Sequence, residues 1–372
     1  MDQADRAVSR FSPFNLCLRA AESGFVPDGI IRAAIRRLLR TRLRELLAGS
    51  ADEIRVRQQR FLSDSNSSPI APVPDLANRQ HYEVPAEFFR LVLGKRLKYS
   101  CCLWDGAAAT LDEAEEQALH ETCHRAEIED GMKILDLGCG WGSVALWIAE
   151  HYPRCEITAV SNSLAQGKFI RSRAEELGAE NLTVITADMN TFAPAGQFDR
   201  VVSVEMFEHM RNHRELLKRV ATWLTPGGRL FVHVFCHRNS AYAFESNGPQ
   251  DWMAEHFFTG GMMPSESLFG EFDDDLRVVR QWTWSGHDYA RTSNAWLDRL
   301  DAQRDTVHRI FDDCYGASES RIWLQRWRIF FMSCAELFAF HDGGEWYVSH
   351  TLFAHQTNTP EPTVSSLPVT PS

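Results

Sequence analysis

The stretch MKILDLGCGWGS, residues 132 to 143, decides the fold class of this chain. Its first six residues are a short apolar run typical of a buried strand, and the residues from Ser143 to Tyr152 repeat apolar side chains at helical spacing. Three glycines between these elements let the backbone turn tightly and approach a ligand closely: Gly138, Gly140 and Gly142. Their GxGxG spacing differs from the GxGxxG of dinucleotide enzymes. By itself, such a turn is equally typical of a plain connection between a strand and a helix.

The same alternation between strand-like and helix-like spacing of apolar residues continues on the C-terminal side of this stretch. Further strands are predicted at residues 156–161, 182–188, 198–206 and 229–236. Helices are predicted between them at residues 165–178 and 213–224, and a TPGG turn follows the second helix. Strands that alternate with helices indicate crossover connections, so the predicted fold class is α/β with a parallel, doubly wound, Rossmann-like sheet. Such sheets bind their ligands beyond the carboxyl ends of the strands.

Polar side chains lie at the carboxyl ends of the first three of these strands, where a ligand is expected. The candidates are Asp136 at the end of the first strand, Ser161, Asn162 and Gln166 at the end of the second, and Asp188 and Met189 at the end of the third. The group after the second strand can hydrogen-bond the hydroxyls of a ribose, while Asp188 can accept from a purine amine and Met189 can pack on the purine face. Each residue alone could merely cap the following helix. Their recurrence at successive strand ends favours a site for a nucleoside-like ligand.

The fourth strand ends in two glutamates and a histidine, within VVSVEMFEHMRNH at residues 201–213. Glu205, Glu208 and His209 stand at i, i+3 and i+4, so they would share one face of a helix that began at the strand end. A simple helix start, with negative charge favoured by the helix dipole, is the alternative. Three titratable groups beside a ligand are costly to desolvate without a purpose, which favours a catalytic role.

The composition restricts the class of protein. The chain has 372 residues and a formal net charge of −11, which argues against a nucleic-acid partner because phosphate neutralisation needs a basic surface. It has no apolar run of about 18 residues, so no membrane span is expected, and its first residues lack the apolar core of a signal peptide. Nine cysteines without a CxxC pair suit reduced thiols in the cytoplasm better than a metal site or disulfides.

Segments outside the predicted sheet have different characters. Residues 28–47 repeat apolar side chains at helical spacing with arginines opposite, which favours a helix docked on the protein body over one lying on a membrane. Residues 62–76, rich in serine and proline, predict a linker or surface loop. The expected division is an N-terminal helical segment and linker (1–75), a core with its lead-in (76–238), a substrate cap that completes the sheet (239–354) and a disordered tail (355–372).

Several longer motifs occur in one order from about residue 28 to residue 354. They are HYEVPAEFF, LGKRLKYSCC, ILDLGCGWG, SNSxxQ, EMFEHM, LFVHVFCH, FFTGGMMPS, HDYARTS and AELFAFHDGGEW. In these motifs the chain resembles the S-adenosylmethionine-dependent methyltransferases of the cyclopropane fatty acid synthase superfamily, and most closely its coclaurine and pavine N-methyltransferase group. The resemblance implies a class I methyltransferase fold, S-adenosylmethionine as cofactor and a small, cyclic or aromatic amine as substrate, with a homodimer as a further expectation.

The resemblance also assigns roles to individual residues. Tyr99 and Ser100 would contact the methionine part of the cofactor, and Gly138 and Gly140 would pass beneath it. The serine, asparagine and glutamine after the second strand would take the ribose, and Asp188 with Met189 would take the adenine. The EMFEH motif would be the acid-base and amine-holding site: neutral His209 could take a proton from the amine, and Glu205 or Glu208 could stabilise the positive charge that moves to nitrogen.

The segment from residue 239 to 272 and the apolar stretch at 321–340 are predicted to form a lid over that site. Their aromatic side chains could stack on a flat ring or a cation, although a core position is the commoner reason for any one of them. The candidate substrate residues are Cys101, His237, Phe257, Tyr289, Trp327 and Phe330, with Trp282 and Glu336 also considered.

The lipid-modifying branch of the superfamily offers a rival function. Those enzymes attack the methyl group with an alkene and hold a bicarbonate as base, and the residue types of that site occur here as Cys101, Glu208, His209 and Tyr289. Glu205 stands where the lipid enzymes usually carry a small residue such as glycine. A second carboxylate repels bicarbonate and attracts an amine, so the amine is the favoured substrate. The alternatives are a cyclopropane-type lipid methyltransferase and an inactive cofactor-binding scaffold.

Overall fold

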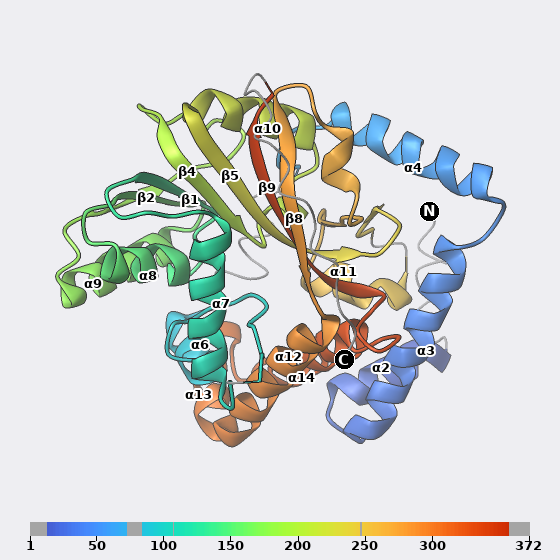
Figure 1. The fold of residues 1–372 in the computed structure, drawn as a ribbon. Coiled ribbons are helices and arrows are strands. Elements are labelled where there is room, and N and C mark those ends of the chain that lie inside the picture. The colour runs from blue at the N-terminus through green and yellow to red at the C-terminus, as the bar shows by residue number, and fades with distance from the viewer. Residues whose placement is uncertain (1–12, 73–83, 107, 246–247, 357–372) are drawn as a thin grey trace.

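A seven-stranded sheet forms the centre of the computed structural model, which describes residues 13–72, 84–106, 108–245 and 248–356 (Figure 1). The strand order is β3-β2-β1-β4-β5-β9-β8, and the first five strands are parallel. Strand β9 runs antiparallel to both of its neighbours. The strands are β1 (Lys133–Leu137), β2 (Glu156–Ser161), β3 (Leu182–Thr186), β4 (Phe198–Val204), β5 (Leu224–His237), β8 (Leu276–Trp284) and β9 (Trp346–His355).

Helices cover both faces of this sheet because side chains alternate along each strand. Ile134 and Ile157 point toward the face covered by α7 (Leu111–Arg125), α8 (Ser143–His151) and α9 (Leu164–Leu177). Leu135 and Val160 point toward the other face and pack with α10 (His213–Trp223). The predicted doubly wound α/β sheet is therefore confirmed, with each predicted strand found within a few residues of its place.

Two local predictions between residues 62 and 228 are wrong. The TPGG turn lies inside β5, where pairing jumps from Phe198–Leu224 to Arg200–Arg229, so these residues bulge from one continuous strand. The linker predicted from residue 62 begins as helix, because α4 (Ala51–Asn66) starts from a capping box of Ser50 and Glu53 and runs on to Asn66. Residues 73–76 of that linker lie outside the described residues.

The predicted N-terminal helix exists as α3 (Asp28–Leu46), which follows α2 (Pro13–Glu22). It docks on the protein body, since Ile31 and Leu43 are buried and Arg32 pairs with Glu336 of α14 (Ser320–Phe338). Figure 1 shows α2, α3 and α4, in blue, lying along one side of the molecule. None of the helices in the described part of the chain is long and apolar enough to cross a membrane.

The C-terminal part supplies helices and the last two strands of the sheet. Its helices are α12 (Gly286–Ala302), α13 (Arg304–Tyr315) and α14, which pack with α6 (Ala86–Val92) in one aromatic cluster. The described residues between 239 and 272 form only short elements: β6 (Tyr242–Ala243), η3 (Pro249–Asp251), α11 (Trp252–His256), β7 (Met262–Met263) and η4 (Leu268–Glu271). The predicted tail begins too early, because His355 pairs with Leu276 in the sheet. Residues 357–372 lie outside the described residues.

Candidate active site

Strand β4 ends at Val204, and the next residue turns the backbone sharply. Glu205 has φ +49°, in the left-handed region that non-glycine residues rarely adopt. Its backbone N–H donates to the carbonyl oxygen of His233 on β5 at 2.8 Å, which holds the turn. Such a conformation costs on the order of 1–3 kcal/mol and is found mainly where function requires it. The turn directs the Glu205 side chain away from the sheet and toward the loop around Cys101.

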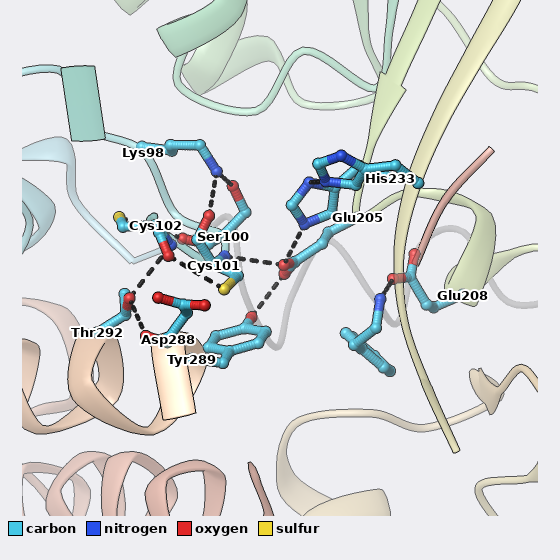
Figure 2. Close-up of polar contacts among 12 residues, drawn as sticks. Lys98, Ser100, Cys101, Cys102, Glu205, Glu208, His233, Asp288, Tyr289 and Thr292 are labelled. Carbon is cyan, nitrogen blue, oxygen red and sulfur yellow. Dashed lines mark hydrogen bonds and ion pairs between the residues drawn. The ribbon is translucent and has the colours of Figure 1, made fainter. Parts of the chain in front are cut away.

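Three donors from separate parts of the chain hold the Glu205 carboxylate (Figure 2). Its Oε1 accepts from the backbone N–H of Cys101 at 2.9 Å and pairs with Nε2 of His233 at 3.2 Å. Its Oε2 accepts from the hydroxyl of Tyr289 on α12 at 2.6 Å. A carboxylate offers about four lone-pair sites, so the described residues leave one site on Oε2 for a further donor.

Glu208 lies apart from this group. It belongs to a short 3-10 helix, η2 (Phe207–His209), and its Oε1 accepts from the backbone N–H of Phe235 at 2.8 Å. Figure 2 shows its carboxylate on the far side of the strand from Tyr289. The prediction that both glutamates and His209 share one helical face is therefore wrong, because the left-handed turn at Glu205 and a single 3-10 turn replace the α-helix that the spacing assumed.

Burial divides the charge unequally between the two glutamates. It raises the pKa of both, and the charge of Glu205 raises the pKa of Glu208 further, to well above the ordinary value. For Glu205, nearby Lys98 and the donors from Tyr289 and Cys101 oppose this rise. Glu208 has only backbone donors, and its Oε2 is buried without a hydrogen-bond partner among the described residues. Of these two carboxyl groups, Glu205 is therefore the one that ionises more readily.

Burial also keeps His209 neutral. It lowers the pKa of the imidazole to about 4, and the attraction of Glu205 only partly opposes this. The ring stacks against Phe258 with 6.0 Å between centroids. A neutral imidazole can accept a proton, so His209 stands near neutral pH in the form that a base requires.

A cavity follows the carboxyl ends of β1, β2, β3 and β4. Its walls include most of the predicted nucleoside residues: Gly138, Gly140, Ser161, Asn162, Gln166, Asp188 and Met189. Glu205 and His209 complete the wall on the β4 side. The sequence did not point to Ala71, Thr259 and Gly261, which also line it, because they come from segments remote from the strand ends.

Two observations show that this cavity suits a ribose-bearing ligand. The Nε2 of Gln166 is buried without a hydrogen-bond partner among the described residues, while its Oε1 accepts from the Ser161 hydroxyl at 2.6 Å. This leaves an amide donor for a hydroxyl of the ligand. A Cβ added to Gly140 would meet no atom of the described chain within 4 Å, so the space beside this glycine is open toward the cavity.

Three other predicted cofactor residues do not line this cavity. Asp136 is buried behind the glycine turn, where burial raises its pKa to about 7. Ser100 accepts a 2.6 Å hydrogen bond from the ammonium of buried Lys98, which also donates to the carbonyl of Cys101. Tyr99 lines a second cavity. The sequence assigned no role to Lys98, although it stands in the motif LGKRLKYSCC; its two hydrogen bonds hold the loop that contacts Glu205.

The second cavity has a volume of about 530 Å³ and meets the first at Glu205 and His209. Tyr289 and Phe330 line it, as predicted substrate residues would. Most of one wall comes from α2 and α3, including Leu18, Ile31 and Leu39. Sequence reasoning missed this wall, although the apolar side of the helix at 28–47 was a signal that it covers an apolar surface.

The remaining substrate candidates lie elsewhere. Phe257 and Trp327 are fully buried behind Phe330, and the Phe257 ring stacks on it with 4.3 Å between centroids. His237 is buried, and its Nε2 pairs with Glu345 at 3.1 Å. Cys101 contacts Glu205 through its backbone N–H. Trp282 stacks with Arg125 on the sheet, and Glu336 pairs with α3.

Comparison with known proteins places this geometry in a family. A model described as "Mycolic acid cyclopropane synthetase" matches residues 74–344. The chain belongs to the mycolic acid cyclopropane synthetase family. The family recognition made from the sequence motifs is thereby confirmed.

Proteins with curated names are similar to this chain over nearly its whole length. (S)-Coclaurine N-methyltransferase of Thalictrum flavum subsp. glaucum is 37% identical, covering 90% of this chain and 94% of the relative. Pavine N-methyltransferase of the same plant is 33% identical, covering 90% and 95%. The crystal structure of coclaurine N-methyltransferase bound to N-methylheliamine and SAH matches with a TM-score of 0.89 at 36% identity, covering 92% of this chain and all of that one.

Proposed function

We propose that this protein transfers a methyl group from S-adenosylmethionine to the nitrogen of a small cyclic or aromatic amine. The observation that carries the proposal is that Glu205 and His209 line both cavities, so they stand where the two ligands meet. Named N-methyltransferases at 33% and 37% identity, and a solved relative with SAH and an N-methylated compound bound, support the same activity.

S-adenosylmethionine supplies an electrophilic methyl group on a sulfonium. The residues of the smaller cavity suit this cofactor: the Gln166 amide for a ribose hydroxyl, and Asp188 with Met189 for the adenine. Gly138 and Gly140 allow the ligand to pass close to the backbone.

The amine must present a lone pair, although an alkylamine is mostly protonated near pH 7. Glu205 would bind the ammonium form through the unused site on Oε2. After the proton has left, it would stabilise the positive charge that the nitrogen acquires as the methyl group is transferred. His209, neutral beside it, would accept the proton directly or through a water. The apolar walls of the larger cavity would exclude other water and align the nitrogen for in-line attack.

We assign Glu208 a supporting part in this scheme. In its protonated state it adds no second charge to the site, and its hydrogen bond fixes the backbone at Phe235, whose side chain lines the larger cavity. Glu208 would therefore position the cavity wall without touching the reacting atoms.

The lipid alternative is weakened by the contacts of Glu205. The donors that could hold a bicarbonate, from Cys101, His233 and Tyr289, already hold the Glu205 carboxylate. A second anion there would meet like charge in a buried site, which is strongly unfavourable. A cationic amine would instead be attracted by the negative charge of Glu205.

The cavity volume of about 530 Å³ falls within the usual range for a drug-sized ligand. Its lining includes the aromatic rings of Phe235, Tyr242, Phe258 and Phe330. Such walls suit a flat aromatic ring that carries the amine, since rings stack or pack edge to face. A cytoplasmic location and a homodimer belong to the same proposal; all nine cysteines are free thiols, in keeping with a reducing compartment.

The test is to incubate the protein with S-adenosylmethionine labelled on the methyl group and three kinds of acceptor. These are tetrahydroisoquinolines, simple alkylamines, and vesicles of an unsaturated phospholipid with and without bicarbonate. We expect label on the tetrahydroisoquinoline nitrogen, independent of bicarbonate. Label confined to the phospholipid and dependent on bicarbonate would replace the amine by the lipid reaction, and binding of the cofactor without any transfer would support the inactive scaffold.

A further inference from the structure

A line of buried and partly buried hydrogen bonds runs from Glu205 across strands β5 and β9 to the end of helix α7. Nε2 of His233 lies 3.2 Å from Oε1 of Glu205, and Nδ1 of His233 lies 2.9 Å from Nε2 of His350. Nδ1 of His350 lies 2.9 Å from Nη1 of Arg125, the last residue of α7. The two histidines are direct partners in the register of β5 and β9, so both rings project from the same face of the sheet.

The chemistry of arginine fixes the direction of every bond in this line. A guanidinium can only donate, so Nδ1 of His350 must accept and its proton must sit on Nε2. That Nε2–H donates to Nδ1 of His233, which places the proton of His233 on Nε2. The His233 Nε2–H then donates to Glu205. Each donor thus points toward the carboxylate, and a reversed order would leave two donors facing each other.

The surroundings keep both histidines neutral. Each ring is fully buried, and Trp284 packs edge-on against both. Burial lowers the pKa of each far below the ordinary value, and the cations of Arg125 and Lys98 lower it further. The positive end of the line lies near the surface, where Arg125 pairs with Glu121 at 2.6 Å and stacks on Trp282 and Trp284.

We propose that Arg125, His350 and His233 form a positioning relay that fixes the His233 tautomer and holds Glu205 as an oriented carboxylate facing the amine. The part played by Glu205 rests on the proposed function, while the proton positions in the relay do not. Arg125 and His350 touch neither ligand cavity. They act on Glu205 through polarised hydrogen bonds, which strengthen one another in a buried chain.

Other ionisable groups also face Glu205 and remain in place when the relay is cut. They are Lys98, Cys101 and Cys102 of the loop before α7, Glu208 and His209 of η2, Tyr289 of α12 and Cys334 of α14. Tyr289 and the Cys101 N–H still donate to the carboxylate in the variants below. The expected effect of losing the relay is therefore a shifted ionisation of Glu205 and not its complete loss.

The direct test is nitrogen NMR of histidine in protein without substrate. Parent protein is expected to show His233 and His350 as neutral rings with the proton on Nε2. Arg125→Met removes the donor that dictates this order, so the His350 tautomer should become mixed. Arg96→Met is the matched control, because Arg96 is also partly buried, pairs with carboxylates and stacks on a tryptophan, Trp147, yet contacts neither histidine. A parent spectrum with His350 protonated on Nδ1 would overturn the relay.

The functional test is the pH dependence of kcat/KM, measured with an amine that the parent protein methylates. Losing the relay makes the carboxylate harder to ionise, so the acid limb should move upward by about one pH unit in Arg125→Met and His350→Leu. His350→Gln can accept from Arg125 and donate to His233, so it should restore the parent profile. An acid limb unchanged in both disrupted variants would refute the positioning role. If the parent methylates no amine, the proposed function fails while the NMR result still decides the relay.

Discussion

The hydroxyl of Tyr289 donates a 2.6 Å hydrogen bond to Oε2 of Glu205, joining helix α12 to the end of strand β4 across 84 residues of sequence. The Tyr289 ring is held for this contact because it stacks on Phe338 with 4.2 Å between centroids and 12° between planes. Glu205 and Tyr289 both line the larger cavity, so their hydrogen bond lies beside the place where the amine nitrogen is proposed to bind.

Tyr289→Phe removes this donor and keeps the stacked ring. A hydrogen bond to a charged group contributes about 1.5–3 kcal/mol, so kcat/KM for the amine should fall by roughly tenfold to a hundredfold. Cofactor affinity, measured by calorimetry, should stay at the parent value because Tyr289 does not line the smaller cavity. Equal losses in amine turnover and cofactor binding would contradict this assignment.

Glu205→Gln separates amine from alkene chemistry. The amide preserves the shape but removes the charge that attracts ammonium, and one such electrostatic contact is worth about 3 kcal/mol, or roughly a hundredfold in rate. Glu205→Gly empties the space in front of the donors from Cys101, His233 and Tyr289. The rate of amine methylation should fall in both variants, and added bicarbonate should not restore it. If the parent protein transferred methyl groups to phospholipid faster than to amines, and only with bicarbonate, an amine would be ruled out as its substrate.

His209→Ala should lose activity most severely near neutral pH. The parent imidazole has its pKa lowered by burial to about 4, so it is neutral and able to accept a proton throughout the neutral range. As pH rises toward the pKa of the amine, free amine becomes available and the variant should recover part of its activity. In the parent, activity should fall in acid as Glu205 and then His209 take up protons. Rate profiles from pH 5 to 10 for both proteins decide this, and a constant ratio across that range would exclude His209 as the base.

Gly140→Val should abolish S-adenosylmethionine binding. The added side chain would project into open space beside the smaller cavity, where the cofactor is proposed to pass. Because Gly140 has φ +52°, backbone strain is a second effect of the change, and Gly178→Val controls for it. Gly178 has φ +66°, equally open surroundings and a position at the end of α9, away from either cavity. Calorimetry and thermal unfolding should show similar destabilisation of both variants and lost binding in Gly140→Val alone.

Phe330→Leu should change the ranking of amines while leaving cofactor affinity unchanged, because this ring lines only the larger cavity. Phe331→Leu is the matched control, since Phe331 is the next residue on α14 but is fully buried and touches neither cavity. Phe257→Leu should alter selectivity less than Phe330→Leu, because Phe257 only supports the Phe330 ring from behind. Competition assays with paired amines measure the ranking. The same shift in Phe330→Leu and Phe331→Leu would mean that general loosening, not the cavity wall, sets selectivity.

The sequence by itself determined the α/β sheet, the glycine turn and the polar groups at the ends of β1 to β3. These features are local, because strand and helix periods, glycine conformations and strand-end positions are set by residues close together in the chain. It also determined the family, since many motifs stand in one order. The local pattern wrongly predicted a turn at TPGG and a linker from residue 62. Pairing with a neighbouring strand outweighed the turn-forming residues in the first case, and a helix that starts from a capping box did so in the second.

Only the tertiary structure decided how the residues of the EMFEH motif separate. The spacing along an assumed helix put Glu205 and Glu208 on one face. Instead, the left-handed turn at Glu205 directs its carboxylate toward Tyr289, while the carboxylate of Glu208 accepts from the backbone of Phe235. Pairing of β5 with β9 brought His350 to His233, and docking of α3 on α14 supplied a cavity wall. No local pattern encodes these contacts, because each depends on segments far apart in sequence that meet only when the whole core packs.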